Sequence, residues 1–423
     1  MQDLEHNYEA LLRISNFQNF NTDQALQLIG ELTDMSLDLG RVDGLKHAVR
    51  LGNELLDRVI EPDQRSILHY FLSNAWSNQR AIKEAGEVPY FDWRQEEIIA
   101  ELTHLRKALA LDQEGLVPEE RVCQILTNLG NSMSHVGRFS KAIEYWDASL
   151  SLMPASHLAR GNRALGIVWY AQTLYSGEHW EILLHQAHTE LKTALLLPVH
   201  DDAKRFFDMQ RRAVSEALGE EGLKKHLDLN QYPSEPADED SFYLKWALEN
   251  RLFLNPLNEL GPYPIAAQDV LTLPSSTGSI RDDYNRLKIA YAGARAGAYE
   301  LLQLDREKEG VNELIQALWG IFSATAQILS AYFDLKISAK NISLYNLWYK
   351  NQDVNMELLD YFSHSPNWSL RGIYSIGIDL SDEAAVNGKE GTDSLLRILK
   401  YAREVLLCLS LSLNTEIRLK GSN

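Results

Sequence analysis

The chain has 423 residues, of which 45% are hydrophobic and 24% charged, and its formal net charge is −18. This is the composition of a globular protein with room for two or three domains, and it excludes disordered and fibrous classes. The acidity argues against a broad nucleic-acid-binding surface and against an anionic membrane as partner, although a local basic pocket is not excluded. Cys123 and Cys408 are the only cysteines, so a disulfide scaffold is excluded and a reducing compartment is expected.

The N-terminal sequence and the most apolar stretch both bear on localisation. The first five residues are polar and acidic, unlike a secretory or mitochondrial leader. Residues 314–333 carry no charge and are about long enough to cross a membrane. They include polar residues on several helical faces, which favours a buried helix in a bundle. The sequence therefore predicts a soluble, cytoplasmic protein without a membrane partner.

Helical periodicity predominates from the start of the chain, and strand alternation is almost absent. Two helix pairs are weakly marked in the first hundred residues. One pair turns at residues 39–42, and the other joins the region of residues 70–76 to that of residues 100–108.

Residues 126–154 contain a clearer pair. Gly130 lies on its first helix, and Ala142, Trp146 and Ser149 follow on its second, with a proline closing the unit. This spacing resembles the tetratricopeptide repeat, in which small residues let two antiparallel helices approach closely and the aromatic residue fills the groove. Residues 165–198 repeat the pattern with a longer turn. We therefore expect residues 1–231 to form a superhelix of such helix pairs, with a surface that binds a protein partner.

Residues 232–241 interrupt this pattern with two prolines and four acidic residues, which is typical of a linker. The net charge is −11 before this segment, −4 within it and −3 after it. The acidity thus belongs mainly to the N-terminal half, and the charge argument against RNA is weak for residues 242–423.

The C-terminal part, residues 242–423, is predicted to be an antiparallel helical bundle. A capping box at Ser279 opens one helix, residues 314–333 form a second, and a third lies near residues 369–376. The last begins at Thr392 and carries apolar side chains inward at three-or-four spacing. These are Leu395, Leu399, Ala402, Leu406 and Leu409. The predicted fold class is all-α.

Several short segments of this part resemble a known family. They are residues 246–260, which are the most specific, and residues 269–274, 287–299, 331–335 and 347–349. In this order they resemble the HEPN domain that follows tetratricopeptide repeats in bacterial proteins. The resemblance covers about residues 242–415.

The resemblance implies a helical bundle that usually dimerises, as a homodimer or a mixed dimer. Active HEPN domains are metal-independent ribonucleases whose signature is an arginine, four to six residues and a histidine. The histidine acts as acid or base near neutral pH, and the arginine stabilises the charge of the phosphorane. Members of the family act in bacterial antiviral defence and toxin–antitoxin systems.

This chain departs from the signature. Arg371 is present, but the expected histidine position falls at about Ser375–Ile376, and the only histidine after residue 226 is His364. The sequence therefore predicts a domain that is degenerate for RNA cleavage, with Arg371 as the one candidate catalytic residue. In an active alternative, Tyr374 or a histidine supplied by another chain replaces the missing histidine. Asp379 is a candidate carboxylate partner of Arg371.

The other candidates have simpler interpretations. Asn250, Asn255 and Asn258 are polar candidates for RNA contact, but Asn255 precedes a proline and backbone capping is the favoured role. The pair Arg41 and His47 also fits the signature spacing, at a frequency expected by chance. No sequence pattern indicates a cofactor or a metal ion.

Three functions remain open from the sequence. The favoured one is a regulatory or effector component of a bacterial antiviral defence or toxin–antitoxin system, not itself an enzyme. The alternatives are an active metal-independent ribonuclease that uses Arg371, and a general peptide-binding adaptor.

Overall fold

The structure is a computed structural model. It describes residues 2–85, 96–112, 115–173, 178–225, 227–232, 234, 240–303, 310–335, 337, 342–344, 346–347, 349–350, 353–354, 367–386 and 392–421. These form two compact units, which are Met1–Met133 with Glu144–Arg163, and Ser134–Ile143 with Ala164–Asn423. The limits of these units differ from the predicted domain boundaries around residues 232–241. Those boundaries stay predictions.

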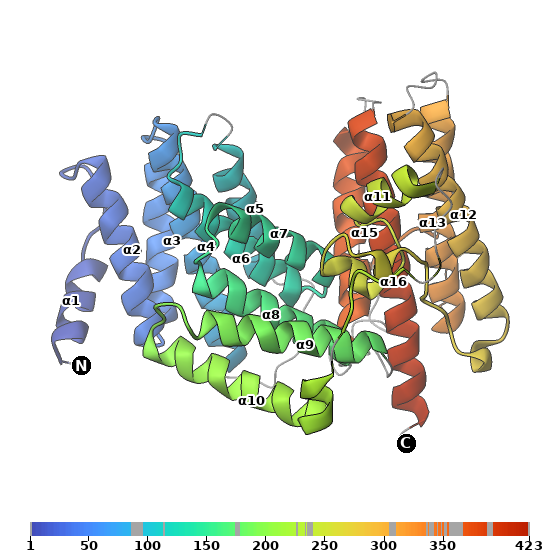
Figure 1. Ribbon diagram of the computed structural model, residues 1–423. Helices are drawn as coiled ribbons and strands as arrows, with labels where there is room; N and C mark the ends of the chain where they lie inside the picture. Colours follow the sequence, from blue (N-terminus) through green and yellow to red (C-terminus); the bar gives the residue numbers. More distant parts are fainter. Residues whose placement is uncertain are drawn as a thin grey trace. The chain divides into compact units, whose positions relative to one another are not determined.

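The described part of the N-terminal half is entirely helical apart from its connections (Figure 1). Its helices are α1 (Gln2–Leu12), α2 (Thr22–Asp38), α3 (Val42–Leu56), α4 (Pro62–Ala85), α5 (Glu96–Ala110), α6 (Glu119–His135), α7 (Phe139–Leu152), α8 (His157–Thr173), α9 (Glu178–Ala194) and α10 (Asp201–Lys224). The predicted turn at residues 39–42 lies between α2 and α3. Successive helices from α2 to α5 pack on one another.

Local sequence explains where these helices begin and how they pack. Asn21 starts α2 with a capping box, in which its Oδ1 accepts from the Gln24 N–H at 2.8 Å and Gln24 Oε1 accepts from the Asn21 N–H at 3.1 Å. In the pair α6 and α7, Trp146 is 1% exposed and lies against Gly130, where a Cβ atom would overlap its ring. Trp146 Nε1 donates to the carbonyl oxygen of Thr127 at 3.2 Å. This is the close helix approach that the spacing predicts.

Two histidines face each other between α4 and α5 in the first unit. The Nδ1 atoms of His69 and His104 are 2.9 Å apart, so one ring donates a hydrogen bond to the other. Burial, together with the positive charge of Lys107, lowers the pKa of both rings to about 4. Both histidines are therefore neutral at pH 7.

This pair predicts a loss of stability in mild acid. Because the folded pKa of about 4 lies below the unfolded value of about 6.5, the unfolded chain takes up protons first as the pH falls. The contribution of the neutral histidine pair to the free energy of unfolding is complete above pH 6.5 and is lost between pH 6.5 and 4. After a discount for partial solvent exposure, we expect the free energy of unfolding to fall by about 1–2 kcal/mol between pH 7.5 and 5.5 because of this pair. Urea unfolding measures this change. A double variant with His69→Leu and His104→Leu should lose this dependence; an equal pH dependence in both proteins would contradict the prediction.

The second half begins with α11 (Ser241–Glu249) and an irregular segment of short 3₁₀ turns. The turns are η2 (Pro256–Glu259), η3 (Pro264–Ala266) and η4 (Ser275–Thr277). The long helices that follow are α12 (Ser279–Gln303), α13 (Val311–Tyr332), α15 (Trp368–Val386) and α16 (Thr392–Gly421). Two two-residue strands, β1 (Tyr349–Lys350) and β2 (Asp353–Val354), pair antiparallel between α13 and α15. The helix predicted near residues 369–376 is thus longer than expected, and the all-α fold class is confirmed.

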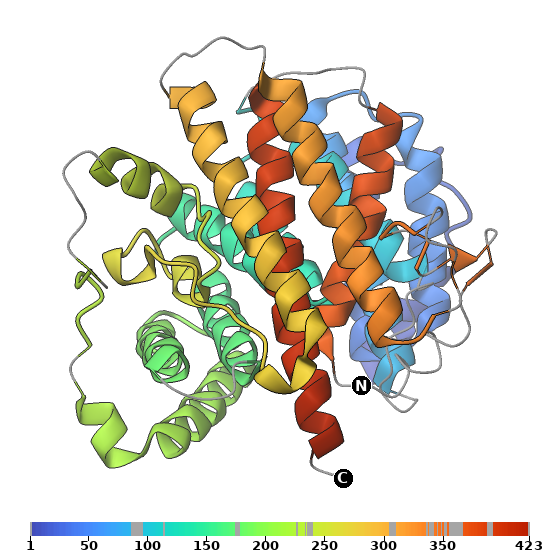
Figure 2. The same cartoon turned by 90° about the vertical axis from the view of Figure 1, so that its right-hand side faces the viewer.

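The four long helices pack side by side (Figure 2), with α12 against α13, α13 against α16, and α15 against α16. The views agree that neighbours along the chain run in opposite directions, as the predicted antiparallel bundle requires. All five predicted inward residues of α16 are fully buried. Their three-or-four spacing builds the core of the bundle.

The helix α13 is long and apolar enough to cross a membrane, and it is the one such helix among the described residues. Its apolar face packs against α12 and α16, with Leu318, Ile321 and Leu329 at most 2% exposed. A core helix of a soluble protein passes the same test of length and composition, so α13 is weak evidence for a membrane span.

Candidate functional site

The start of α15 is fixed to α16 by Asn367, the residue that precedes it. Asn367 Oδ1 accepts a hydrogen bond from the N–H of Leu370 at 3.3 Å and so caps the first turn. Its Nδ2 donates to the carbonyl oxygen of Ser412 at 3.0 Å and to Glu416 Oε1 at 2.7 Å. Because Asn367 and Glu416 are at most 2% exposed, this turn is anchored in the interior of the second unit.

Arg371 lies in the first turns of α15 and is only 7% exposed. Its Cζ atom lies 4.2 Å from the centre of the Trp368 ring, which is a cation–π contact. Trp368 is itself 39% exposed and covers one face of the guanidinium. The residues that follow are Gly372, Ile373, Tyr374, Ser375, Ile376 and Gly377, all buried except the partly exposed Ser375. No imidazole therefore lies one turn beyond Arg371 on α15.

The turn between α6 and α7 packs directly on this part of α15. Gly137 has a φ of +79°, which favours glycine, and a Cβ atom there would overlap the carbonyl oxygen of Trp368. On the other side, a Cβ atom at Gly372 would lie 2.6 Å from the carbonyl oxygen of Gly137 and 3.0 Å from Cys408 Sγ. Two glycines thus allow the backbones to touch within the second unit.

Arg138 follows Gly137 and is buried with two carboxylates of the bundle. Its Nε and Nη2 atoms donate to Glu404 Oε1 at 3.1 Å and Oε2 at 2.7 Å, and its Nη1 donates to Asp379 Oδ2 at 2.5 Å. The Arg138 side chain is 2% exposed, and those of Glu404 and Asp379 are 8% and 13% exposed. Burial alone would lower the pKa of Arg138, but the two carboxylates outweigh it and raise that pKa well above its usual value. Arg138 is therefore a fixed cation.

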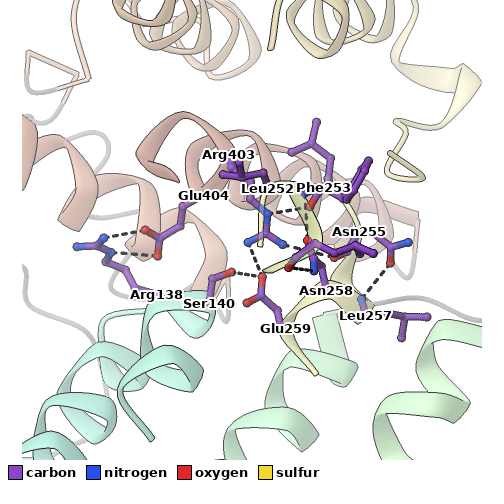
Figure 3. Close-up of polar contacts among 12 residues, drawn as sticks. Arg138, Ser140, Leu252, Phe253, Asn255, Leu257, Asn258, Glu259, Arg403 and Glu404 are labelled. Carbon is purple, nitrogen blue, oxygen red and sulfur yellow. Dashed lines mark hydrogen bonds and ion pairs between the residues drawn. The ribbon is translucent and has the colours of Figure 1, made fainter. Parts of the chain in front are cut away.

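A second buried arginine, Arg403, lies beside Glu404 on α16 and holds the irregular segment before α12 (Figure 3). Its Nη1 lies 2.6 Å from Glu259 Oε1, and its Nε donates to the carbonyl oxygen of Phe253 at 2.7 Å. Ser140 Oγ donates to the same Glu259 oxygen at 2.8 Å. The Glu259 side chain is completely buried and that of Arg403 is 4% exposed, so this ion pair is shielded from water.

The asparagines predicted as capping residues bond to backbone groups. Asn255 Oδ1 accepts from the Leu257 N–H at 3.0 Å, which caps η2. Asn258 Nδ2 donates to the carbonyl oxygen of Leu248 at 3.1 Å, and its Oδ1 accepts from the Phe253 N–H at 3.1 Å. Asn255 and Asn258 are fully buried, and neither presents its amide to solvent.

Asn250, the third of these asparagines, ends α11. Its Nδ2 donates to the carbonyl oxygen of Trp246 at 2.9 Å, and it is the C-cap residue of the helix. All three asparagines therefore hold the backbone of residues 246–260.

A third buried arginine fastens the same segment from α12. Arg295 makes two parallel contacts of 2.9 Å with the carboxylate of Asp269 and donates to the carbonyl oxygen of Leu252 at 2.9 Å. Asp269 also accepts from the Leu254 N–H at 2.6 Å. Two-pronged pairing of this kind fixes orientation as well as adding energy.

The family model LA2681-like HEPN matches residues 311–395, which comprise α13, α15 and the first turn of α16. Residues 311–395 form a HEPN-like domain. No curated protein and no solved structure matches the chain.

The matched range is shorter than the predicted resemblance over residues 242–415. Residues 246–260, which carry the most specific resemblance, lie outside it. The contacts of Asn255, Asn258 and Glu259 give that segment a structural role beside the HEPN-like domain. The tetratricopeptide resemblance of the N-terminal half has no family match and stays a prediction.

The predicted site residues of the HEPN-like domain lie in different surroundings. Arg371 stacks on Trp368, and Tyr374 is 3% exposed within the same helix. Asp379 accepts a hydrogen bond from Arg138, and its predicted pairing with Arg371 stays a prediction. In the chance match to the signature, Arg41 pairs with Asp43, and His47 Nε2 bonds to the carbonyl oxygen of Ile14.

The buried charged residues Arg138, Glu259, Arg403 and Glu404 were not predicted as a cluster. The sequence does indicate burial for two of them, because Arg403 and Glu404 directly follow Ala402, a residue on the inward face of α16. Their partners lie far away in the sequence, and Arg138 and Glu404 are 266 positions apart. Among the described residues, no three histidine, cysteine or acidic side chains gather as a metal site.

Proposed function

We propose that the protein is a regulatory or effector component of a bacterial antiviral defence or toxin–antitoxin system. In this proposal the helix pairs of the N-terminal half bind a protein partner, and the HEPN-like domain does not cleave RNA through Arg371. The proposed location is the cytoplasm. The match to the LA2681-like HEPN family supports the defence setting, and the surroundings of Arg371 support the loss of cleavage.

The observation that carries the proposal is the closed environment of Arg371. An arginine that stabilises a phosphorane must reach the phosphate oxygens, yet Arg371 is 7% exposed and stacked on Trp368. The backbone of Gly137 lies against the adjoining residue Gly372 and restricts access further. RNA therefore has no open approach to this guanidinium.

Helix α15 also lacks the histidine of the signature after Arg371. Cleavage of RNA without a metal needs a side chain that exchanges protons near pH 7, which a histidine provides and a phenol with an ordinary pKa near 10 does not. Tyr374 is 3% exposed, so neither its chemistry nor its position suits it to replace the histidine.

We expect the purified full-length protein to show no Arg371-dependent cleavage of total RNA or transfer RNA. The wild type, Arg371→Ala and Arg397→Ala should give the same background, with Arg397 as an exposed arginine on α16. The measurement is the fraction of full-length RNA that remains over time. A wild-type rate more than about tenfold above that of Arg371→Ala, with Arg397→Ala unaffected, would show an active ribonuclease and contradict the proposal.

The partner of the repeat surface is best sought in native cells. A pull-down of the full chain, with mass spectrometry and RNA sequencing on one eluate, should return defence or toxin–antitoxin proteins and no enriched RNA. Recovery of housekeeping proteins alone would favour the general peptide-binding adaptor. We also propose that a homodimer or mixed dimer forms through residues 242–423, as in the HEPN family.

A further inference from the structure

Four asparagines of the first compact unit lie in a row across three helices. They are Asn74 on α4, Asn128 and Asn131 about one turn apart on α6, and Asn162 on α8. Asn128 Nδ2 donates to Asn74 Oδ1 at 3.0 Å, and Asn162 Nδ2 donates to Asn131 Oδ1 at 3.0 Å. Asn131 is exposed, and the other three are half-buried. We name these four residues the amide row.

Trp146 fixes the orientation of two amides in the row. An indole N–H can only donate, so the Asn131 atom that lies 3.1 Å from Trp146 Nε1 is the oxygen. The same oxygen accepts from Asn162, which occupies both of its lone pairs. Asn131 therefore keeps its Nδ2 group to donate, and Asn162 keeps its Oδ1 to accept. Within the described part of the chain, no other group bonds to either atom.

The other pair of amides leaves the same two kinds of group open. Asn128 donates to the oxygen of Asn74, so Asn128 keeps its Oδ1 and Asn74 keeps its Nδ2. From α4 to α8 the open groups are thus a donor, an acceptor, a donor and an acceptor. One edge of an extended peptide presents its C=O and N–H groups in the same alternation. The amide row therefore matches the main chain of a peptide rather than a particular side chain.

The charge of this part of the chain also favours a peptide over a nucleic acid. The amide row carries no formal charge, and residues 1–231 have a net charge of −11. A nucleic acid is bound chiefly through its phosphates, which need lysine or arginine partners. The main chain of a peptide is uncharged and needs only hydrogen-bond partners.

We propose that the amide row binds an extended peptide segment of a protein partner through the main chain of that segment. This rests on the proposed function, in which the helix pairs of the N-terminal half bind a protein. Because the amides are already held by one another and by Trp146, they lose little side-chain freedom when a peptide binds. Main-chain hydrogen bonds then supply affinity, and the side chains beside the row select the sequence.

The first experiment changes one open donor of the row. The probe is a phage-displayed library of random twelve-residue peptides, selected on the full chain, and the most enriched peptide is synthesised with fluorescein for anisotropy. Asn131→Asp replaces the open N–H donor with an oxygen that repels a peptide carbonyl, and it should raise the Kd at least about tenfold. Asn53→Asp is the matched control, because Asn53 is exposed on α3 outside the row and undergoes the same change of charge. Its Kd should stay within about twofold of wild type. Failure to enrich any peptide, or equal Kd values in the two variants, overturns the proposal.

The second experiment changes the peptide. N-methylation removes one main-chain N–H at a time and leaves the side chain in place, and at one or more positions it should raise the Kd at least about tenfold. The double variant Asn128→Ala and Asn162→Ala lacks both open acceptors, so the most sensitive position should lose most of its sensitivity there. Circular dichroism confirms that the variant is folded. Tolerance of N-methylation at every position, or displacement of the peptide by total RNA, contradicts main-chain recognition by the row.

The outcome for the amide row is separate from the outcome for the proposed function. Neither binding measurement depends on Arg371 or on RNA cleavage. Peptide binding that requires Asn131, together with a pull-down that returns housekeeping proteins alone, supports the row and contradicts the defence setting. A pull-down of defence proteins that Asn131→Asp leaves unchanged supports the setting and contradicts the row.

Discussion

Replacing Arg403 with alanine is expected to destabilise the second unit by about 3–5 kcal/mol, the usual cost of breaking a buried ion pair by removing one partner. The variant leaves the Glu259 carboxylate charged and completely buried without its cation. It also removes the donor to the Phe253 carbonyl oxygen, so the segment before α12 loses its attachment to α16. Desolvation of Glu259 dominates this cost, because water cannot reach the site.

The measurement for Arg403→Ala is the protection of Cys408 from thiol labelling across a urea series, which follows the second unit. Cys123 follows the first unit in the same samples. Arg286→Ala is the control, because Arg286 pairs with Asp283 on the surface of α12 with 72% of its side chain exposed. Exposed pairs contribute little, so this variant should lie within about 0.5 kcal/mol of wild type. A decrease of less than about 1 kcal/mol in the free energy of unfolding for Arg403→Ala would contradict a stabilising buried ion pair between Arg403 and Glu259.

The helices could be predicted from the sequence because their signals are local. Apolar spacing on α16 predicted five inward residues, and all five are fully buried. Gly130 and Trp146 predicted one close helix pair, and the structure places them in contact. Backbone capping by Asn255 was the favoured interpretation for the same reason, and Asn255 bonds to a backbone group two residues away.

The charge cluster could not be predicted because its members meet only in the folded chain. Arg138 belongs by sequence to a repeat-like turn, where a charged residue is ordinarily exposed to solvent. Its burial depends on Glu404 and Asp379, which lie more than 200 residues away. The absence of the signature histidine after Arg371 was visible in the sequence, whereas the packing of Gly137 on the start of α15 was not.

Substituting Gly137 with alanine is the second change with a large expected effect. It should lower the free energy of unfolding of the second unit by about 3 kcal/mol or more. The new Cβ atom would overlap the Trp368 carbonyl oxygen, and a φ of +79° is itself unfavourable for alanine by about 1 kcal/mol. Gly278→Ala separates the two causes, because Gly278 has a φ of +54° and open space around its Cα atom. It should cost about 1–3 kcal/mol, because its ψ of −126° is also unfavourable for alanine, and leave α15 unchanged.

Hydrogen exchange of residues 368–377 in the full chain, read by mass spectrometry, tests most directly whether the start of α15 is closed. We predict that these amides exchange as slowly in the wild type as residues 402–409 of the buried helix α16. They should exchange at least about tenfold faster in Gly137→Ala, but not in Gly278→Ala. Wild-type exchange as fast as that of the exposed first turn of α10, or no difference between the two glycine variants, would contradict a closed site at Arg371.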